Sequence, residues 1–195
     1  MAEDDLKKYR GKRDFAKTRE PRGRRGSTAG ARFVIQHHDA STDHYDFRLE
    51  VDGVLKSWSV PKGPSTDPRE KRLAVPTEDH PLEYGTFEGV IPEGEYGAGT
   101  VLVWDAGTYE NTTARHGEPV PMADGLHRGH VTFALHGEKL TGGYALTRFR
   151  TGKSESWLLV KARDDGADAR RTPVRTQPES VRSGRTLDEV AGDDG

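Results

Sequence analysis

The 195-residue chain contains no cysteine. This absence excludes a disulfide-stabilised fold, a zinc site built on thiolates and a cysteine nucleophile. Any metal ion must therefore bind to histidine, aspartate or glutamate side chains. An intracellular setting is the simpler expectation for such a chain, and we expect the protein to be cytoplasmic.

Long hydrophobic segments are also missing. No stretch approaches the roughly 20 apolar residues that cross a bilayer, and the N-terminal residues MAEDDLKKYR contain no apolar signal core. Hydrophobic and charged residues each make up 32% of the chain, so part of its length is expected to lie outside a packed core. We expect one folded domain that is monomeric and does not associate with membranes.

Helical periodicity is nearly absent, whereas short runs rich in β-branched and aromatic residues recur between turn residues. Asp52-Gly53 joins two of these runs and is typical of a two-residue hairpin turn. Eight such runs predict an antiparallel β-barrel, closed or partly open, with little helix. The runs are FVIQHH, HYDFRLEV, VLKSWSV, KRLAVPT, TVLVWDAGTYE, HVTFALHG, GGYALTRF and ESWLLVKA.

The two ends of the chain differ in composition from its middle. Residues 1–32 hold eleven Lys or Arg against five Asp or Glu, whereas the remainder holds 19 against 27. We predict that residues 1–32 form a basic, mobile arm. Such an arm either binds a partner that carries phosphates or is merely solvated. Residues 164–195 are polar and contain no aromatic residue, which predicts a flexible linker or tail. Residues 33–163 are then the β-barrel domain.

The most informative segment is FVIQHHDASTDHYDFRLEV, residues 33–51. Its second half alternates polar and apolar residues, which predicts a strand. If residues 39–43 form a hairpin loop, His38 lies directly opposite His44, and Asp46 is the next residue on the same face. Two imidazoles and one carboxylate form the ligand set of an open divalent-metal site.

Such a site can polarise bound water and act as a Lewis acid. Arg48 extends from the same face as Asp46, and a guanidinium suits a phosphate better than a neutral carbonyl group. These residues therefore favour phosphoryl chemistry. The spacing H-x5-H-x-D is also compatible with a polar hairpin that binds nothing. In this register His37 faces the core, where we expect a packed or hydrogen-bonded histidine.

The sequence resembles the 3′-phosphoesterase module of bacterial ATP-dependent DNA ligase D, an end-processing enzyme of nonhomologous end joining. The resemblance covers roughly residues 10–163. The matching strings are RDF, FVIQHHDASTDHYDFRLEVDGVLKSWSVPKGPS, KRLAVPTEDHPLEYGTFEGVIPEGEYGAGTVLVWD and SWLLVKA.

This resemblance implies removal of a 3′-terminal ribonucleoside and then of the remaining 3′-phosphate, which leaves a 3′-hydroxyl. Mn²⁺ is the expected metal, with Co²⁺, Zn²⁺ or another divalent ion as alternatives. The implied partners are DNA or RNA/DNA 3′ ends and a ligase or polymerase in the same chain or a separate one. The implied metal ligands are His38, His44 and Asp46; the implied catalytic residues are Arg48, His80 and Tyr84; and the implied substrate-binding residues are Arg13, Asp14, Glu20, Lys62 and Arg72.

His80 is the candidate for protonating the leaving oxygen or for hydrogen bonding to the phosphate. Two other functions stay open from the sequence. A non-haem Fe(II) oxygenase uses a similar ligand set, and a noncatalytic module that binds or scaffolds DNA ends would keep the groove without turnover. The final segment SVRSGRTLDEV is compatible both with a stand-alone protein and with an excised domain.

Overall fold

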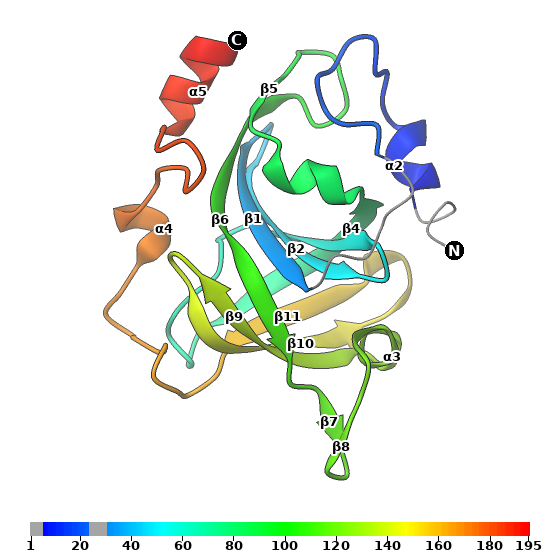
Figure 1. Ribbon diagram of the computed structural model, residues 1–195, viewed down its shortest axis with the longest axis vertical. Helices are drawn as coiled ribbons and strands as arrows, with labels where there is room; N and C mark the ends of the chain where they lie inside the picture. The colour runs from blue at the N-terminus through cyan, green and yellow to red at the C-terminus, as the bar shows by residue number, and fades with distance from the viewer. Residues whose placement is uncertain (1–5, 24–30) are drawn as a thin grey trace.

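The computed structural model describes residues 6–23 and 31–195 (Figure 1). Eight antiparallel strands close into a barrel in the order β1-β2-β3-β4-β11-β10-β9-β6, and β6 pairs again with β1. The predicted antiparallel barrel is therefore confirmed. Its strands are β1 (Arg32–Asp39), β2 (Asp43–Val51), β3 (Val54–Val60), β4 (Lys71–His80), β6 (Gly99–Asn111), β9 (His130–Gly137), β10 (Thr141–Arg150) and β11 (Ser156–Lys161).

The remaining elements are short. The described residues contain no helix that is long and apolar enough to cross a lipid bilayer. Strand β5 (Gly89–Ile91) pairs with β6, and β7 (Ala114–Arg115) with β8 (Glu118–Pro119). The helices are α2 (Lys7–Gly11), η1 (Leu82–Thr86), α3 (Met122–Arg128), η2 (Gly152–Ser154), α4 (Pro173–Thr176) and α5 (Leu187–Asp194).

The barrel interior holds the main hydrophobic core. Alternate residues of every barrel strand point into it, as period-two geometry requires. Phe47 and Phe133 stack there with ring centroids 5.7 Å apart, and Trp104 is fully buried. Burial of one such side chain contributes on the order of 2 to 3 kcal/mol to folding. The interior is therefore filled with side chains, and a functional site is expected on another surface of the barrel.

A second, smaller cluster lies on the opposite face of β1, β3 and β6. Val34, Leu55 and Val103 project from that outer face and pack against Tyr84 of η1 and Tyr9 of α2. Figure 1 shows η1 and α2 lying over this side of the barrel wall. The wall is consequently covered on both sides, and polar residues on its outer face can be buried.

Residues 6–23 fall within the arm that the composition predicts to be mobile, yet the structure packs them against the barrel. Leu6 and Tyr9 are buried, and the Tyr9 hydroxyl donates to the Pro21 carbonyl. Two apolar anchors hold this segment, although its average composition is polar. Residues 1–5 and 24–30, to which the same prediction applies, lie outside the described residues.

The C-terminal residues expected to form a flexible tail also pack against the barrel. The indole of Trp104 donates to the Gln177 carbonyl over 2.8 Å, and the amide of Val181 donates to the Val103 carbonyl over 2.9 Å. Val190 of α5 is fully buried, and Figure 1 shows α5 beside β5. A few specific contacts hold this segment, and a composition-based prediction does not register them.

Candidate metal centre and active site

The hairpin of β1 and β2 has the register expected from the sequence. His38 lies opposite His44, and Gln36 lies opposite Asp46. Because Asp39 and Asp43 also pair, the connecting loop is two residues shorter than the one that the composition suggests. The pairing itself is unchanged, so both imidazoles project from the outer face, with ring centroids 4.9 Å apart.

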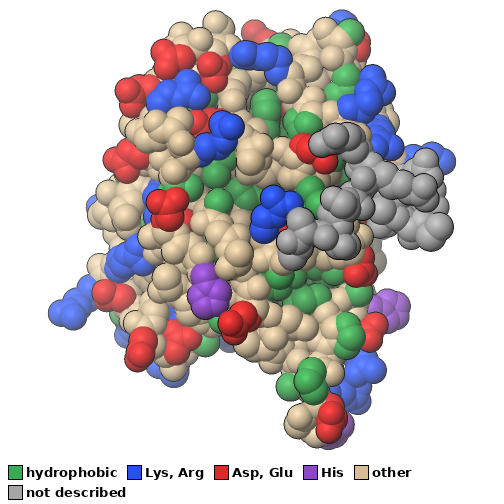
Figure 2. Space-filling view, in the orientation of Figure 1, with side chains coloured by type: hydrophobic (Ala, Val, Ile, Leu, Met, Phe, Trp, Pro, Cys, Tyr) green, Lys and Arg blue, Asp and Glu red, His purple; other side chains and the backbone are tan. Residues whose placement is uncertain are grey.

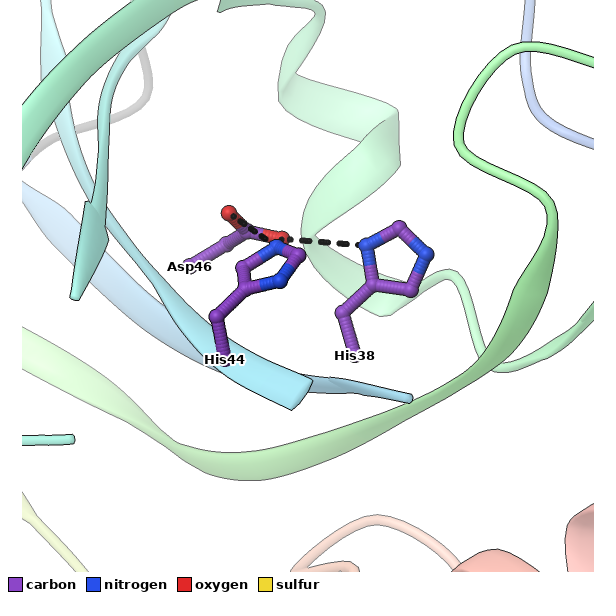
Figure 3. Close-up of side chains that lie close together, drawn as sticks. All are labelled: His38, His44 and Asp46. Carbon is purple, nitrogen blue, oxygen red and sulfur yellow. Dashed lines mark hydrogen bonds and ion pairs between the residues drawn. The ribbon is translucent and has the colours of Figure 1, made fainter. Parts of the chain in front are cut away.

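His38, His44 and Asp46 converge on one point (Figure 3). One ligand atom from each residue lies within 4.8 Å of the other two. The Nε2 of His44 is 3.2 Å from the Asp46 carboxylate, and the Nδ1 of His38 is 3.5 Å from it. His38 and Asp46 are buried and His44 is half-buried. The three side chains thus form a compact set of two nitrogens and one carboxylate.

The outer nitrogen of each imidazole is held by the backbone. The Nε2 of His38 donates to the Gly97 carbonyl over 2.6 Å, and the Nδ1 of His44 donates to the Thr42 carbonyl over 2.9 Å. The opposite nitrogen of each ring then faces Asp46. Protein metal sites use this arrangement, in which a backbone acceptor fixes the tautomer of the ligating histidine. The donor set and its orientation therefore fit a divalent cation such as Mn²⁺, Co²⁺ or Zn²⁺.

The Asp46 carboxylate is the negative centre of this cluster. Burial alone would raise its pKa, but the nearby charge of Arg48 and the hydrogen bonds to His38 and His44 outweigh burial and hold the pKa well below the usual range. For His44, burial lowers the pKa. The hydrogen bond to Asp46 and the charge of that carboxylate more than reverse this effect, so the pKa of His44 is raised. The site consequently favours positive charge beside Asp46.

Arg48 is buried beside this cluster and fixed on several sides. Its Nε donates to Gln36 Oε1 over 2.7 Å and its Nη1 to Ser57 Oγ over 2.9 Å. Its Cζ lies 4.9 Å from the centroid of the Tyr84 ring, and its Nη2 lies 3.5 Å from Asp46. The guanidinium therefore has one preset orientation toward the metal ligands.

These residues line a cavity of about 350 Å³ on the outer face of the barrel wall. Two loops and the N-terminal segment complete its walls. Besides the metal ligands and Arg48, its lining consists of Arg13, Ala40, Ser41, Ser59, Thr77, Glu78, His80, Tyr84, Ile91, Tyr96 and Gly97.

His80 is buried in the wall of the cavity as a neutral imidazole. Burial lowers its pKa well below the usual range, and the charges of Arg48 and Arg13 lower it further. Its Nδ1 donates to the Glu78 carbonyl over 2.8 Å, so Nε2 is the acceptor nitrogen, and it lies 3.5 Å from Nη2 of Arg13. In this state Nε2 can accept a hydrogen bond from water, whereas both roles expected from the sequence require a proton on that nitrogen.

The buried neutral state of His80 predicts a pH dependence of stability. The unfolded histidine takes up a proton below about pH 6.5 and the folded one does not, so the free energy of unfolding should fall as pH decreases. For His80 alone the slope approaches about 1.4 kcal/mol per pH unit. Denaturant unfolding of the wild type and of His80→Asn between pH 7.5 and 5 measures this term. A matching slope in the two proteins would contradict it.

Tyr84 and Glu20 support the cavity from behind its surface. The Tyr84 hydroxyl donates to Glu20 over 2.7 Å, and Arg13 pairs with the same carboxylate over 2.9 Å. Burial raises the pKa of Tyr84 well above its usual range, and the charge of Glu20 adds to this effect. Tyr84 therefore stays protonated and serves to position Arg48 and Arg13. Arg13 also pairs with Glu78 over 3.2 Å.

Besides Glu20, which lies behind the cavity wall, three residues expected to bind substrate lie outside this cavity. Asp14 is exposed, and its carboxylate accepts a hydrogen bond from the Ala16 amide over 3.0 Å. Lys62 and Arg72 line a separate hollow of about 460 Å³ together with Glu70. The structure therefore brings Arg13, but not these three residues, to the metal ligands.

A register shift in β4 explains the position of Arg72. Leu55 pairs with His80 and Ser57 pairs with Thr77, so β4 advances three residues while β3 advances two. Such a bulge ends the strict alternation of faces along a strand. The even separation of Arg72 and His80 alone would put both side chains on the same face of β4. Because of the bulge they lie on different faces, and Arg72 lies opposite the core residue Leu159 of β11.

Four residues of this candidate site were not recognised from the sequence. Gln36 and Ser57 fix Arg48. Both could have been predicted from the strand pairing, because Gln36 lies opposite Asp46 and Ser57 lies opposite Arg48. Glu78 precedes His80 by two residues and pairs with Arg13. The fourth, Tyr96, comes from the glycine-rich loop before β6, and no periodic signal marks it.

Comparison with known proteins places these residues in a family context. Residues 36–148 match the family model described as the DNA ligase D 3′-phosphoesterase domain. The chain is 51% identical over 93% of its length to the multifunctional non-homologous end joining protein LigD of Pseudomonas aeruginosa. It is also 51% and 47% identical, over 83% of its length, to the LigD proteins of Mycobacterium tuberculosis and Mycolicibacterium smegmatis. The chain spans about a fifth of the length of these relatives, with 22%, 20% and 21% of them covered.

Proposed function

Because the chain belongs to the DNA ligase D 3′-phosphoesterase domain family, we propose that it is a divalent-metal phosphoesterase that processes 3′ ends in DNA repair. It removes 3′-terminal ribonucleosides and 3′-phosphates from DNA or RNA/DNA primer-templates and leaves a 3′-hydroxyl. The observation that carries this proposal is the convergence of His38, His44 and Asp46 beside a buried, preset Arg48.

The three converging side chains are the proposed metal ligands, and Mn²⁺ is the expected ion. When bound, the ion supplies Lewis-acid polarisation of a phosphoryl oxygen and of water. Arg48 faces the same space and is placed to bind a phosphate oxygen. Because Gln36 and Ser57 hold its guanidinium in place, this charge needs little reorganisation as negative charge develops on the phosphoryl group.

The proposed reaction consists of two hydrolytic steps. In the first, a water oxygen bonds to phosphorus, the bond from phosphorus to the 5′ oxygen of the terminal ribonucleoside breaks, and that oxygen takes up a proton. In the second, a water oxygen bonds to the phosphorus of the remaining 3′-phosphate, the bond from phosphorus to the 3′ oxygen breaks, and that oxygen takes up a proton as inorganic phosphate is released. The Nε2 of neutral His80, which lies 3.5 Å from Nη2 of Arg13, can accept a hydrogen bond from the attacking water.

Arg13 provides a second cation in the cavity. Its guanidinium contacts Glu20, Glu78 and the Nε2 side of His80, so the N-terminal segment contributes to the proposed substrate site. The face in Figure 2 carries acidic and basic side chains intermixed, without a broad patch of either sign among its described residues. Recognition of the nucleic acid end is therefore assigned to the cavity.

We further propose that the chain acts with a DNA ligase and polymerase, either within one polypeptide or as a separate partner. The support for this is that its relatives are multifunctional end-joining proteins of which it matches about a fifth. For Asp14, Lys62 and Arg72, the family resemblance supports a substrate-binding role. Because they lie outside the cavity, we propose that they contact the nucleic acid beyond the terminal phosphate.

A labelled primer-template with one 3′-terminal ribonucleoside tests the proposed function. With Mn²⁺, a 3′-phosphate product should form first and then convert to a 3′-hydroxyl product, and a chelator should stop both steps. Unchanged substrate despite demonstrated binding would indicate the noncatalytic end-binding module. Oxygen uptake with Fe(II), without phosphate release, would indicate the oxygenase.

A further inference from the structure

Tyr96 lies at the rim of the cavity, in the loop between β5 and β6. Its side chain is 47% exposed, whereas the other two tyrosines near the cavity, Tyr9 and Tyr84, are buried. Both buried tyrosines have hydrogen-bond partners and packing roles that explain them. Tyr96 is only partly covered, so part of its aromatic surface is open to a ligand.

The loop that carries Tyr96 is tied to the metal ligands. Gly97 adopts a positive φ of 74°, which favours glycine at this position, and its carbonyl accepts the hydrogen bond from His38. Two turns close the loop through hydrogen bonds from the amide of Glu95 to the Pro92 carbonyl and from the amide of Ala98 to the Glu95 carbonyl. Tyr96 therefore directly precedes the residue whose carbonyl holds His38, one of the proposed metal ligands.

Two cations lie against the Tyr96 ring. The Nζ of Lys12 is 4.7 Å from the ring centroid and 3.3 Å from the hydroxyl, and the Cζ of Arg13 is 5.3 Å from the centroid. Lys12 is itself 41% exposed. Both cations also pair with Glu78, over 3.0 and 3.2 Å. A ligand at this rim therefore meets an aromatic ring beside two groups that can donate to a phosphate, and such a combination binds a nucleobase and its phosphate.

We propose that Tyr96 is the stacking platform for the base of the 3′-terminal nucleoside, which makes the loop between β5 and β6 the subsite of the leaving group. This inference rests on the proposed function. A cavity of about 350 Å³ admits the last nucleotide and excludes a duplex. The retained bases of a primer are already paired and stacked, whereas the terminal nucleoside can turn a free face toward an aromatic side chain.

The subsite predicts different effects on the two proposed steps. A ribonucleoside-terminated substrate places its last base on Tyr96, but a 3′-phosphate substrate has already lost that base. Tyr96→Ala should therefore lower kcat/KM about tenfold for ribonucleoside removal and less than about twofold for phosphate removal. Tyr96→Phe keeps the ring and should retain both activities. Phe149→Ala removes an exposed aromatic of β10 that does not line the cavity and serves as the matched control.

A binding measurement tests the same inference without turnover. With 2-aminopurine as the terminal base and a chelator present, wild-type protein and Tyr96→Phe should quench the fluorescence of the probe. Tyr96→Ala should quench it much less, and Phe149→Ala should behave as the wild type.

Equal losses on both substrates, or unchanged rates and quenching in Tyr96→Ala, would overturn the inference. Absence of turnover by the wild type on either substrate would overturn the proposed function instead. The fluorescence measurement then still decides whether Tyr96 binds a terminal base.

Discussion

Replacing His44 with alanine should reduce turnover by about 10³-fold or more, a loss of at least about 4 kcal/mol of transition-state stabilisation. The side chain supplies one of the two nitrogens that face Asp46, and its other nitrogen is already held by the Thr42 carbonyl. Because His44 is only half-buried, the fold should tolerate the change. Steady-state kinetics with saturating Mn²⁺ and calorimetric titration of the metal should show a joint loss of activity and affinity.

His37 offers a matched control for this substitution. It lies next to His38 in β1, but it stacks on Tyr45 with ring centroids 4.2 Å apart and pairs with Asp43 over 2.7 Å. His37→Ala should therefore leave metal affinity and turnover within a fewfold of the wild type. A folded His44→Ala protein with wild-type activity would contradict the metal assignment, as would a His37→Ala protein with the larger loss.

Replacing Arg48 with lysine should lower kcat by about 10²-fold although the positive charge is retained. The guanidinium contacts Gln36, Ser57 and Asp46 at once through different nitrogens, and a single ammonium group cannot make all three contacts. The substrate phosphate would then meet a charge that is less well oriented. Single-turnover kinetics on the 3′-phosphate substrate separates this loss from weaker binding.

Arg150→Lys is the control for this second prediction, because Arg150 is exposed at the end of β10 and does not line the cavity. It should retain wild-type kinetics. Thermal unfolding should show that Arg48→Lys remains folded under assay conditions. If folded Arg48→Lys turns over as fast as the wild type, orientation of the guanidinium does not contribute to the chemistry.

The barrel and the metal-ligand hairpin were predictable from the sequence because both depend on local rules. Alternation along residues 44–51 fixes which side chains share a face, and a short polar loop fixes the pairing of His38 with His44. A loop two residues shorter than expected leaves that pairing intact. The local pattern therefore sufficed because a single hairpin carries all three proposed ligands.

Other parts of the cavity depend on long-range packing. The bulge in β4 that separates Arg72 from His80 has no signal in the alternation of its residues. Arg13 reaches the cavity, and Glu20 lies behind its wall, because Tyr9 is buried against η1, a contact between segments about 75 residues apart. The position of Tyr96 depends on the conformation of its loop, in which the Gly97 carbonyl accepts a hydrogen bond from His38. Residue patterns do not encode these contacts, and only the resemblance to the family pointed toward Arg13 and Glu20.

The direct test of the metal centre is a crystal structure of the protein with Mn²⁺, with diffraction data collected at the manganese absorption edge. We expect a strong anomalous peak at bonding distance from Nδ1 of His38, Nε2 of His44 and the Asp46 carboxylate. Its absence at saturating Mn²⁺, or a peak held by other side chains, would contradict the account.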